Sequence, residues 1–134
     1  MVKVYKMTKE QFKQAFTKAL NGIGNDVVNE LVRTCPVDTG FLKNSIYYEV
    51  SGKKLNIHMA DYAFYVEFGT MPHEITPSMK KALHWKGSDG KDAFATHVWH
   101  PGTQPQPFMR NMINTKLRDI VYENLTRQFN DANA

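Results

Sequence analysis

The residues with the clearest potential for chemistry form the triplet Asp38-Thr39-Gly40. A carboxylate in such a loop can share a proton with a second carboxylate, and the pair can activate a water molecule for hydrolysis. The chain contains one triplet, so this chemistry would need two copies of the chain in a dimer. A dimeric hydrolase is therefore the first functional hypothesis.

The sequence around the triplet favours a structural role instead. Aspartic proteases, whose catalytic loop carries this triplet, place apolar strand residues before it and a small residue after it. Here Thr34-Cys35-Pro36 precedes the triplet and the bulky Phe41 follows it. We interpret the triplet as a turn that starts the next element, with Asp38 as a cap and Gly40 supplying a permissive backbone. The protease remains the less favoured alternative.

The histidines are the second candidate set, for metal binding. A zinc site needs three or four converging ligands, and residues three apart on a strand, such as His97 and His100, point to opposite faces. Cys35 is the single cysteine, which excludes a disulfide framework and a four-cysteine site. We therefore expect neither a metal nor another cofactor. The histidines considered are His58, His73, His84, His97 and His100.

Glu67 is the third candidate, because it lies between the apolar residues Val66 and Phe68. A buried carboxylate with a raised pKa can act as a general base. No second carboxylate or nucleophile occurs at a suitable spacing, and no serine has the context of a nucleophile elbow. We expect Glu67 to pair with a basic residue such as Arg110 and so to hold this aromatic segment to the last helix.

A long helix is predicted at the start of the chain, and it must position these residues. Thr8 and Gln11 have the spacing of a capping box, and Pro36 ends the helical pattern. We interpret Gly22 and Gly24 as a bend in this helix. The apolar positions at helical spacing are Phe12, Phe16, Ala19, Leu20, Ile23, Val27 and Leu31.

A second long helix is predicted from Phe108 onward. Its apolar stripe runs to Phe129, and Asn130 onward is expected to be a frayed tail, residues 130–134. The stripe consists of Phe108, Met112, Ile113, Leu117, Ile120, Val121, Leu125 and Phe129.

Period-two alternation predicts two β-hairpins between the helices. Residues 46–50 and 55–59 alternate around a Gly52-Lys53 turn. A second hairpin has arms near Leu83–Trp85 and Phe94–Val98, with its turn at Gly87 to Gly90. Residues 62–68 are predicted as a short helix ended by Gly69, and residues 70–80 as a loop.

The segment His100 to Pro107 is predicted to be irregular, because its three prolines fix φ and lack a donor. The predicted fold is α+β. It is one domain over residues 1–134, in which two long helices pack on a small, mostly antiparallel sheet with a projecting β-hairpin and a proline-rich loop.

The net charge of +4 on 134 residues makes a small nucleic-acid-binding protein another alternative. The whole excess lies in residues 1–54, with 9 basic and 5 acidic residues. Lys9, Lys13 and Lys18 fall on the outer face of the first helix, without interleaved exposed aromatics, which favours a solvated face. There is no apolar signal core at the N-terminus and no run long enough to span a bilayer, so no membrane role is expected.

The second hairpin and the proline-rich loop favour protein contacts. Long ordered loops usually carry function, and aromatic residues are preferred anchors at protein interfaces. We therefore predict a subunit interface there. Its residues are Trp85, Trp99, His100, Pro101, Pro105 and Pro107.

Three segments, in order, resemble a known family. Residues 36–46, 62–70 and 100–109 are similar to the tail-component family of long-tailed bacteriophages typified by gene product ten of HK-type lambdoid phages. The matching positions are Pro36, Asp38, Thr39, Gly40, Leu42, Tyr62, Ala63, Tyr65, Val66, Glu67, Phe68, Gly69, Thr70, Gly102, Thr103 and Phe108.

The resemblance implies a non-enzymatic structural protein of the virion. Such proteins act in head–tail joining or tail completion, as repeated subunits of a homo-oligomeric neck ring or connector. Their partners are other neck, head-completion or tail proteins, and DNA passes through the channel only as cargo. The protein would reside in the virion, and in the host bacterial cytoplasm during assembly.

The resemblance also implies structural roles for the matching segments. Asp38 to Gly40 would form the turn between the first helix and the sheet. Tyr65, Glu67, Phe68 and Gly69 would form a packing unit. Pro105, Pro107 and Phe108 would set the start of the last helix.

Overall fold

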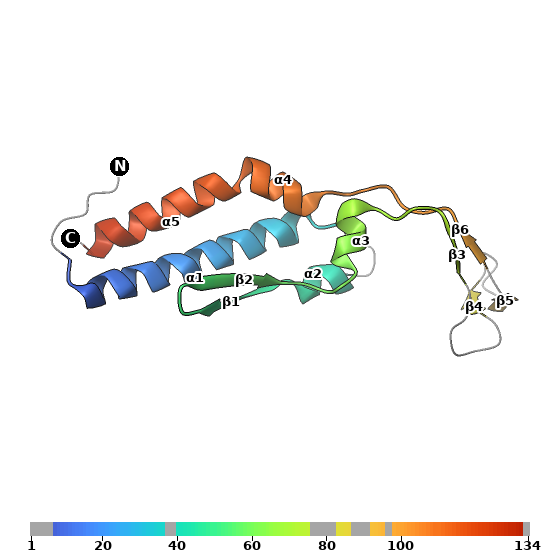
Figure 1. The fold of residues 1–134 in the computed structure, drawn as a ribbon, viewed down its shortest axis with the longest axis horizontal. Coiled ribbons are helices and arrows are strands. Elements are labelled where there is room, and N and C mark those ends of the chain that lie inside the picture. Colours follow the sequence, from blue (N-terminus) through green and yellow to red (C-terminus); the bar gives the residue numbers. More distant parts are fainter. Residues whose placement is uncertain (1–6, 37–39, 76–82, 87–91, 96–97, 133–134) are drawn as a thin grey trace.

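The protein is described here from a computed structural model, which describes residues 7–36, 40–75, 83–86, 92–95 and 98–132. The chain forms an elongated molecule (Figure 1). Two long helical segments lie side by side with a hairpin against one of them. Two extended segments lead away from this body to short strands at the far end. The order of elements is α1, α2, β1, β2, α3, β3, β4, β5, β6, α4 and α5.

Helix α1 spans Lys9–Thr34 and begins as the sequence predicts. The Thr8 side chain accepts the N–H of Gln11, and the Gln11 side chain accepts the N–H of Thr8, each at 3.0 Å. Cys35 ends the helix in an extended conformation, next to Pro36. The helix buries Ala15, Ala19, Ile23, Gly24, Val27 and Leu31.

Gly22 and Gly24 do not end or divide α1, which is one continuous helix of 26 residues. They allow close contacts instead. A Cβ on Gly22 would lie 2.1 Å from Oδ1 of Asn124, and one on Gly24 would lie 2.5 Å from the ring of Tyr48. The two glycines therefore mark sites of close side-chain approach, and the predicted bend stays a prediction.

The closing helix is divided in two, which the sequence does not predict. Helix α4 spans Phe108–Thr115, and α5 spans Leu117–Ala132. Lys116 separates them with φ −122° and ψ −31°, outside helical values, although its N–H still bonds to Met112. Helix α5 also continues beyond Phe129, through the start of the predicted tail.

The first hairpin is confirmed. Strand β1, Tyr47–Ser51, pairs antiparallel with β2, Lys54–His58, and Val50 lies opposite Leu55. Tyr48 and Val50 are half-buried, whereas Tyr47 and Glu49 are exposed, as alternation requires. A short helix, α2 (Phe41–Ser45), precedes the hairpin and was not predicted. Gly40 begins it with φ 83°.

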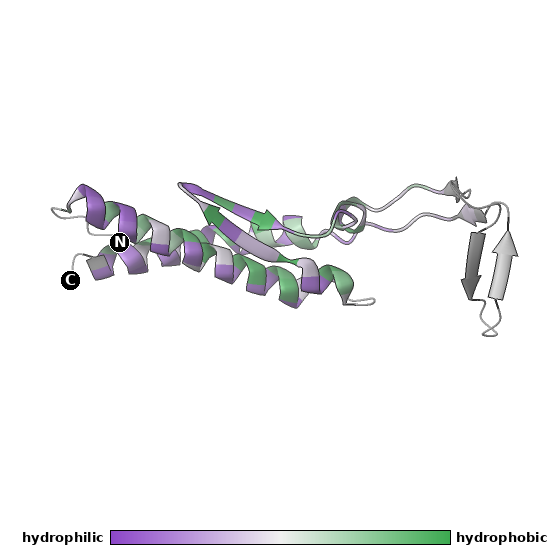
Figure 2. Ribbon diagram, turned by 90° about the horizontal axis from the view of Figure 1, so that it is seen from below, coloured by the Kyte–Doolittle hydropathy of each residue, from purple (hydrophilic) through white to green (hydrophobic). Residues whose placement is uncertain are grey.

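The core lies between α1, the hairpin and α4–α5, which contact α1 on different sides. Hydrophobic and hydrophilic residues alternate along the helices and the hairpin in Figure 2, as elements with one buried face require. The α+β fold class is confirmed. The central core residues are Ile23, Val27, Leu31, Cys35, Leu42, Ile46, Ala63, Phe108 and Met112.

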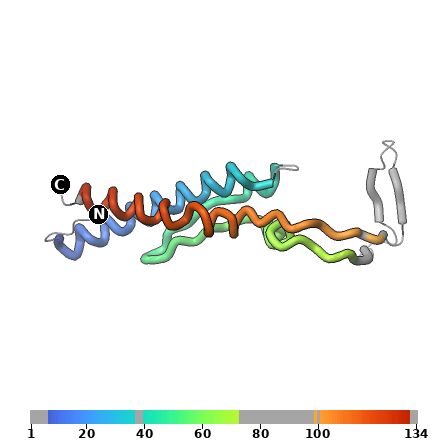
Figure 3. The backbone as a smooth tube through the Cα atoms, turned by 90° about the horizontal axis from the view of Figure 1, so that it is seen from above, coloured from blue at the N-terminus to red at the C-terminus, as the bar shows by residue number. Residues whose placement is uncertain are grey.

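Helix α3 spans Ala63–Phe68 and ends at Gly69, as predicted. After it the structure differs from the predicted loop. Strand β3, His73–Ile75, pairs antiparallel with β6, Val98–His100, so that His73 lies opposite His100. Figure 3 shows the two chain segments that carry these strands running side by side away from the helices.

The second hairpin pairs β4, Leu83–Lys86, with β5, Asp92–Ala95. Its predicted turn, Gly87 to Gly90, lies outside the described residues. Val98 belongs to β6 and pairs with Ile75, not with the arm of this hairpin. Local alternation could not reveal that pairing, because β3 is only three residues long and its partner is distant in sequence. The described strands form three separate antiparallel pairs.

Candidate assembly interface

The carboxylate of Glu67 joins α3 to the first turn of α4. It is 1% exposed and accepts the backbone N–H groups of Met109 at 2.8 Å and Arg110 at 3.2 Å. The guanidinium Nε of Arg110 donates to the same carboxylate at 3.1 Å. The predicted pairing of Glu67 with Arg110 is confirmed, and the carboxylate accepts three hydrogen bonds in all.

A second junction crosses the two extended segments just beyond α3. Thr70 and Thr103 exchange both backbone hydrogen bonds, at 3.1 and 3.0 Å, and their hydroxyls lie 3.1 Å apart. The preceding residues are Gly69 and Gly102, with φ of 74° and 84°. A Cβ on Gly69 would lie 2.6 Å from the carbonyl oxygen of Thr103, and one on Gly102 would lie 2.4 Å from that of Thr70. Only glycine fits both places.

Together these contacts anchor an arm, which we define as residues 69–107. Gln106 adds a backbone hydrogen bond to Val66 at 2.9 Å. The base of the arm is therefore fixed to α3 and α4 by a buried carboxylate, a two-residue bridge and a backbone contact. The distal strands β3 to β6 lie at the far end of the arm (Figure 1).

Exposed aromatic rings surround the base of the arm. Phe41 stacks on Tyr62 with centroids 5.9 Å apart, and Phe64 lies 4.8 Å from Phe68. The Arg110 guanidinium lies over the Phe68 ring at 5.2 Å. We call these rings the α3 aromatic surface, and their exposure ranges from 38% to 63%. The members are Phe41, Tyr62, Phe64, Tyr65 and Phe68.

Tyr65 and Phe68, which the resemblance assigns to a packing unit, are 58% and 50% exposed and contact the Phe64 ring. Their role in a packing unit stays a prediction. Helix α3 is short and lies on the surface, so one side of it packs inward through Ala63, Val66 and Glu67 while the rings point away. The sequence does not predict this surface as a whole, because Phe41 is distant in sequence from α3.

The predicted interface residues divide into three groups. Trp99 is 66% exposed on β6, and Pro101 and Pro105 are exposed between β6 and α4. Pro107 is half-buried at the position that begins α4. Trp85 lies in β4 and His100 in β6. All of them belong to the arm, and their role as an interface stays a prediction.

The remaining family-type positions lie mostly at the junctions. Leu42, Ala63 and Phe108 are buried in the core, and Pro36 is half-buried. Gly40 starts α2, as a permissive backbone position should. Asp38 and Thr39 lie outside the described residues, so the roles proposed for the Asp-Thr-Gly triplet stay predictions.

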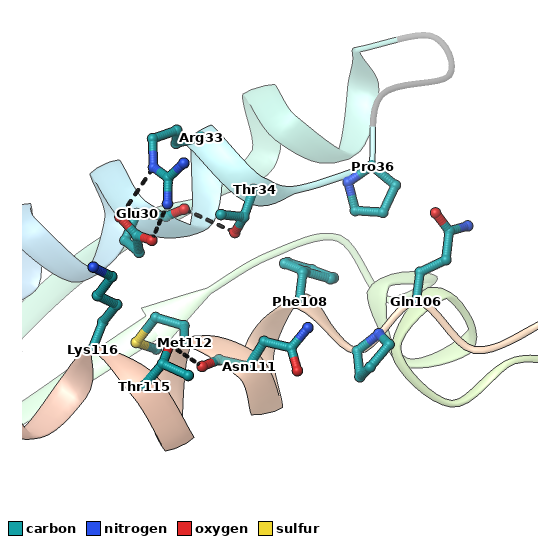
Figure 4. A pocket seen from close by; sticks show the side chains of 11 residues that line it. Glu30, Arg33, Thr34, Pro36, Gln106, Phe108, Asn111, Met112, Thr115 and Lys116 are labelled. Carbon is teal, nitrogen blue, oxygen red and sulfur yellow. Dashed lines mark hydrogen bonds and ion pairs between the residues drawn. The ribbon is translucent and has the colours of Figure 1, made fainter.

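A pocket of about 340 Å³ opens between the end of α1 and helix α4 (Figure 4). Arg33 bonds to Glu30 through two nitrogens, and this bond holds the pKa of the Glu30 carboxyl below its ordinary value. Figure 4 shows Lys116, Thr115 and Asn111 on the opposite wall. The lining offers charged, amide and hydroxyl groups, and the hydroxyls of Thr34 and Thr115 donate to backbone carbonyls within their own helices.

Two further findings concern chemistry. Burial raises the pKa of the Cys35 thiol, so the thiol stays protonated near neutral pH. Within the described ranges, no group of three or more histidine, cysteine or acidic side chains is placed to hold a metal ion. Nor does any helix in that part of the chain have the length and apolarity needed to cross a membrane.

Comparison with known proteins gives one match. Residues 2–69 match the model of the HK97-gp10-like family, described as "Bacteriophage HK97-gp10, putative tail-component". Neither the curated proteins nor the solved structures that were searched include a match. The matched segment contains α1, the first hairpin and α3, and it ends at the glycine where the arm begins. The chain therefore belongs to the HK97-gp10-like family of bacteriophage tail components.

Proposed function

We propose that this protein is a structural, non-enzymatic subunit of the neck of a long-tailed bacteriophage. In this role it acts in head–tail joining or tail completion, as one of several identical subunits in a ring. Family membership supports the tail-component part of this proposal. The anchored arm supports the part that concerns a ring.

The observation that carries the proposal is an arm with a rigid base and an exposed aromatic residue. A ring needs two different surfaces on each subunit, so that each subunit contacts the next head to tail. The arm, with Trp99 at 66% exposure, can provide one surface. The α3 aromatic surface can provide another, because exposed aromatic rings are preferred interface anchors.

The proposed partners follow from this placement. The arm contacts an adjacent copy of the chain, and other surfaces contact further neck, head-completion or tail proteins. DNA passes through the ring as cargo. Assembly takes place in the host bacterial cytoplasm, and the finished subunit resides in the virion.

Sedimentation velocity over a range of protein concentrations tests the proposal. We expect concentration-dependent association, and we expect Trp99→Ala and Phe64→Ala to weaken it. Tyr122→Ala is the matched control, because Tyr122 is 55% exposed on α5, outside the arm and the α3 aromatic surface. The arm contact would be refuted if the wild-type chain stays monomeric at every concentration and the Trp99→Ala variant still completes phage necks.

A further inference from the structure

A basic groove lies at the other end of the molecule, far along the chain from the arm. Lys9, Phe12, Lys13 and Phe16 of α1 form one side of it, and Lys53 of the β1–β2 turn forms the other. Its volume is about 360 Å³. The groove exists only in the folded chain, because the turn of the hairpin reaches the first two turns of α1.

The floor of the groove is apolar. Phe12 is 50% exposed, although its helical spacing predicts a place in the core. Its ring stacks on Phe16 at 6.3 Å and also contacts Phe129 of α5 at 5.2 Å. These contacts hold an exposed ring in a defined position, so the groove does not depend on a freely moving side chain.

The rim of the groove is positively charged. Three lysines line it, and no acidic side chain among the described residues does. Lys9 is also the first residue of α1, where the helix dipole adds positive potential. The sequence alone suggested that these lysines were not interleaved with exposed aromatics; the structure corrects this, because Phe12 is exposed between Lys9 and Lys13.

We propose that this groove binds an acidic segment of another protein, which places an apolar side chain on Phe12 and Phe16. Its carboxylates face Lys9, Lys13 and Lys53. Charge complementarity gives the segment its orientation and rate of association, and the apolar floor supplies contact area.

The geometry favours a polypeptide over single-stranded nucleic acid. The Phe12 ring packs against Phe16 and Phe129 and is half-exposed, which suits contact with a single apolar side chain. A nucleic-acid strand also needs a basic track over several nucleotides, whereas the lysines here surround one short groove. The occupant is therefore an acidic peptide segment with at least one large apolar residue.

This groove is separate from the arm and from the α3 aromatic surface. If the chain self-associates but does not bind the peptide, the groove proposal fails and the ring proposal stands. If it binds the peptide but does not self-associate, the ring proposal fails and the groove proposal stands. The two proposals can therefore fail independently.

Fluorescence anisotropy of labelled probes tests the groove with the full-length chain. The first probe is a peptide of glutamates that carries leucines, the second replaces the leucines with serine, and the third is oligothymidylate of matched charge. We expect the leucine peptide to bind most tightly and its affinity to fall as salt is raised. Tighter binding of oligothymidylate, or equal binding of the serine peptide, would overturn the proposal.

Variants locate the binding. Lys13→Gln combined with Lys53→Gln should weaken binding of the leucine peptide at least about tenfold. Lys116→Gln combined with Arg118→Gln removes the same charge from α4–α5 and should leave the affinity nearly unchanged. Thr17 is exposed and lines the groove, so Thr17→Glu should also weaken binding without disturbing the core. Equal losses in the control pair, or none in the groove variants, would refute the site.

Discussion

The carboxylate of Glu67 caps a helix that begins 41 residues later, through its hydrogen bonds to the N–H groups of Met109 and Arg110. Pro107 occupies the N-cap position of α4 and makes no side-chain cap. Glu67 supplies the missing acceptor from α3 and places a negative charge at the positive end of the helix dipole. One buried side chain thus fixes both ends of the arm.

We expect Glu67→Gln to destabilise the fold by about 2 kcal/mol, because one acceptor oxygen becomes a donor that faces other donors. Urea unfolding measures this change. Arg110→Gln should cost less, since Arg110 is half-exposed and its charge is screened. Glu49→Gln, on an exposed strand position, is the control and should change stability by less than about 0.5 kcal/mol. Equal effects of Glu67→Gln and Glu49→Gln would contradict the capping role.

The two arm glycines can be compared with a third glycine of the same backbone class. Gly52 has φ 59° but no atom within 4 Å of an added Cβ, so Gly52→Ala should cost only about 1 kcal/mol for the left-handed backbone. Gly69→Ala and Gly102→Ala should cost clearly more, because each Cβ also meets a backbone carbonyl of the opposite segment. Thermal unfolding measures all three. Similar losses of stability at the three sites would show that the contact between the new Cβ and the opposite carbonyl contributes nothing.

Replacing glycine by alanine inside a helix normally stabilises it by about 1 kcal/mol. Gly22→Ala and Gly24→Ala should do the opposite here, since Asn124 and Tyr48 occupy the space of the new methyl groups. Asn25→Ala, at an exposed position of the same helix, is the control and should be neutral or stabilising. Chemical denaturation distinguishes the signs. A stabilising Gly22→Ala would disprove the close packing of Asn124.

Cys35 predicts a dependence of stability on pH. Its pKa is raised in the folded chain by burial, so the unfolded chain loses this proton first as pH rises. The free energy of unfolding should therefore decline above the pKa of an unfolded thiol, about 8.5. The decline should continue until the folded thiol also ionises. Cys35→Ala should remove this part of the pH dependence in urea titrations, and an unchanged profile would contradict it.

Much of the local structure is readable from the sequence, because local rules decide it. Thr8 and Gln11 mark the start of α1, and Pro36 marks its end. Alternation around Gly52 marks the first hairpin, and Gly69 marks the end of α3. Glu67 could be paired with Arg110 in advance, because a carboxylate between apolar neighbours needs a partner of opposite charge.

The tertiary structure decided what depends on contacts distant in sequence. The pairing of β3 with β6, and of Thr70 with Thr103, follows from two segments that meet only when α3 and α4 are joined. The exposure of Phe12, Tyr65 and Phe68 depends on which face of each helix packs against another element. Helical periodicity alone does not predict that face. The sequence predicts a bend at Gly22 and Gly24. The tertiary structure shows that these glycines leave space for the side chains of Asn124 and Tyr48. The sequence therefore determined α1, the first hairpin, α3 and the family. The packing of distant segments determined the remaining elements and the surfaces that we propose bind other proteins.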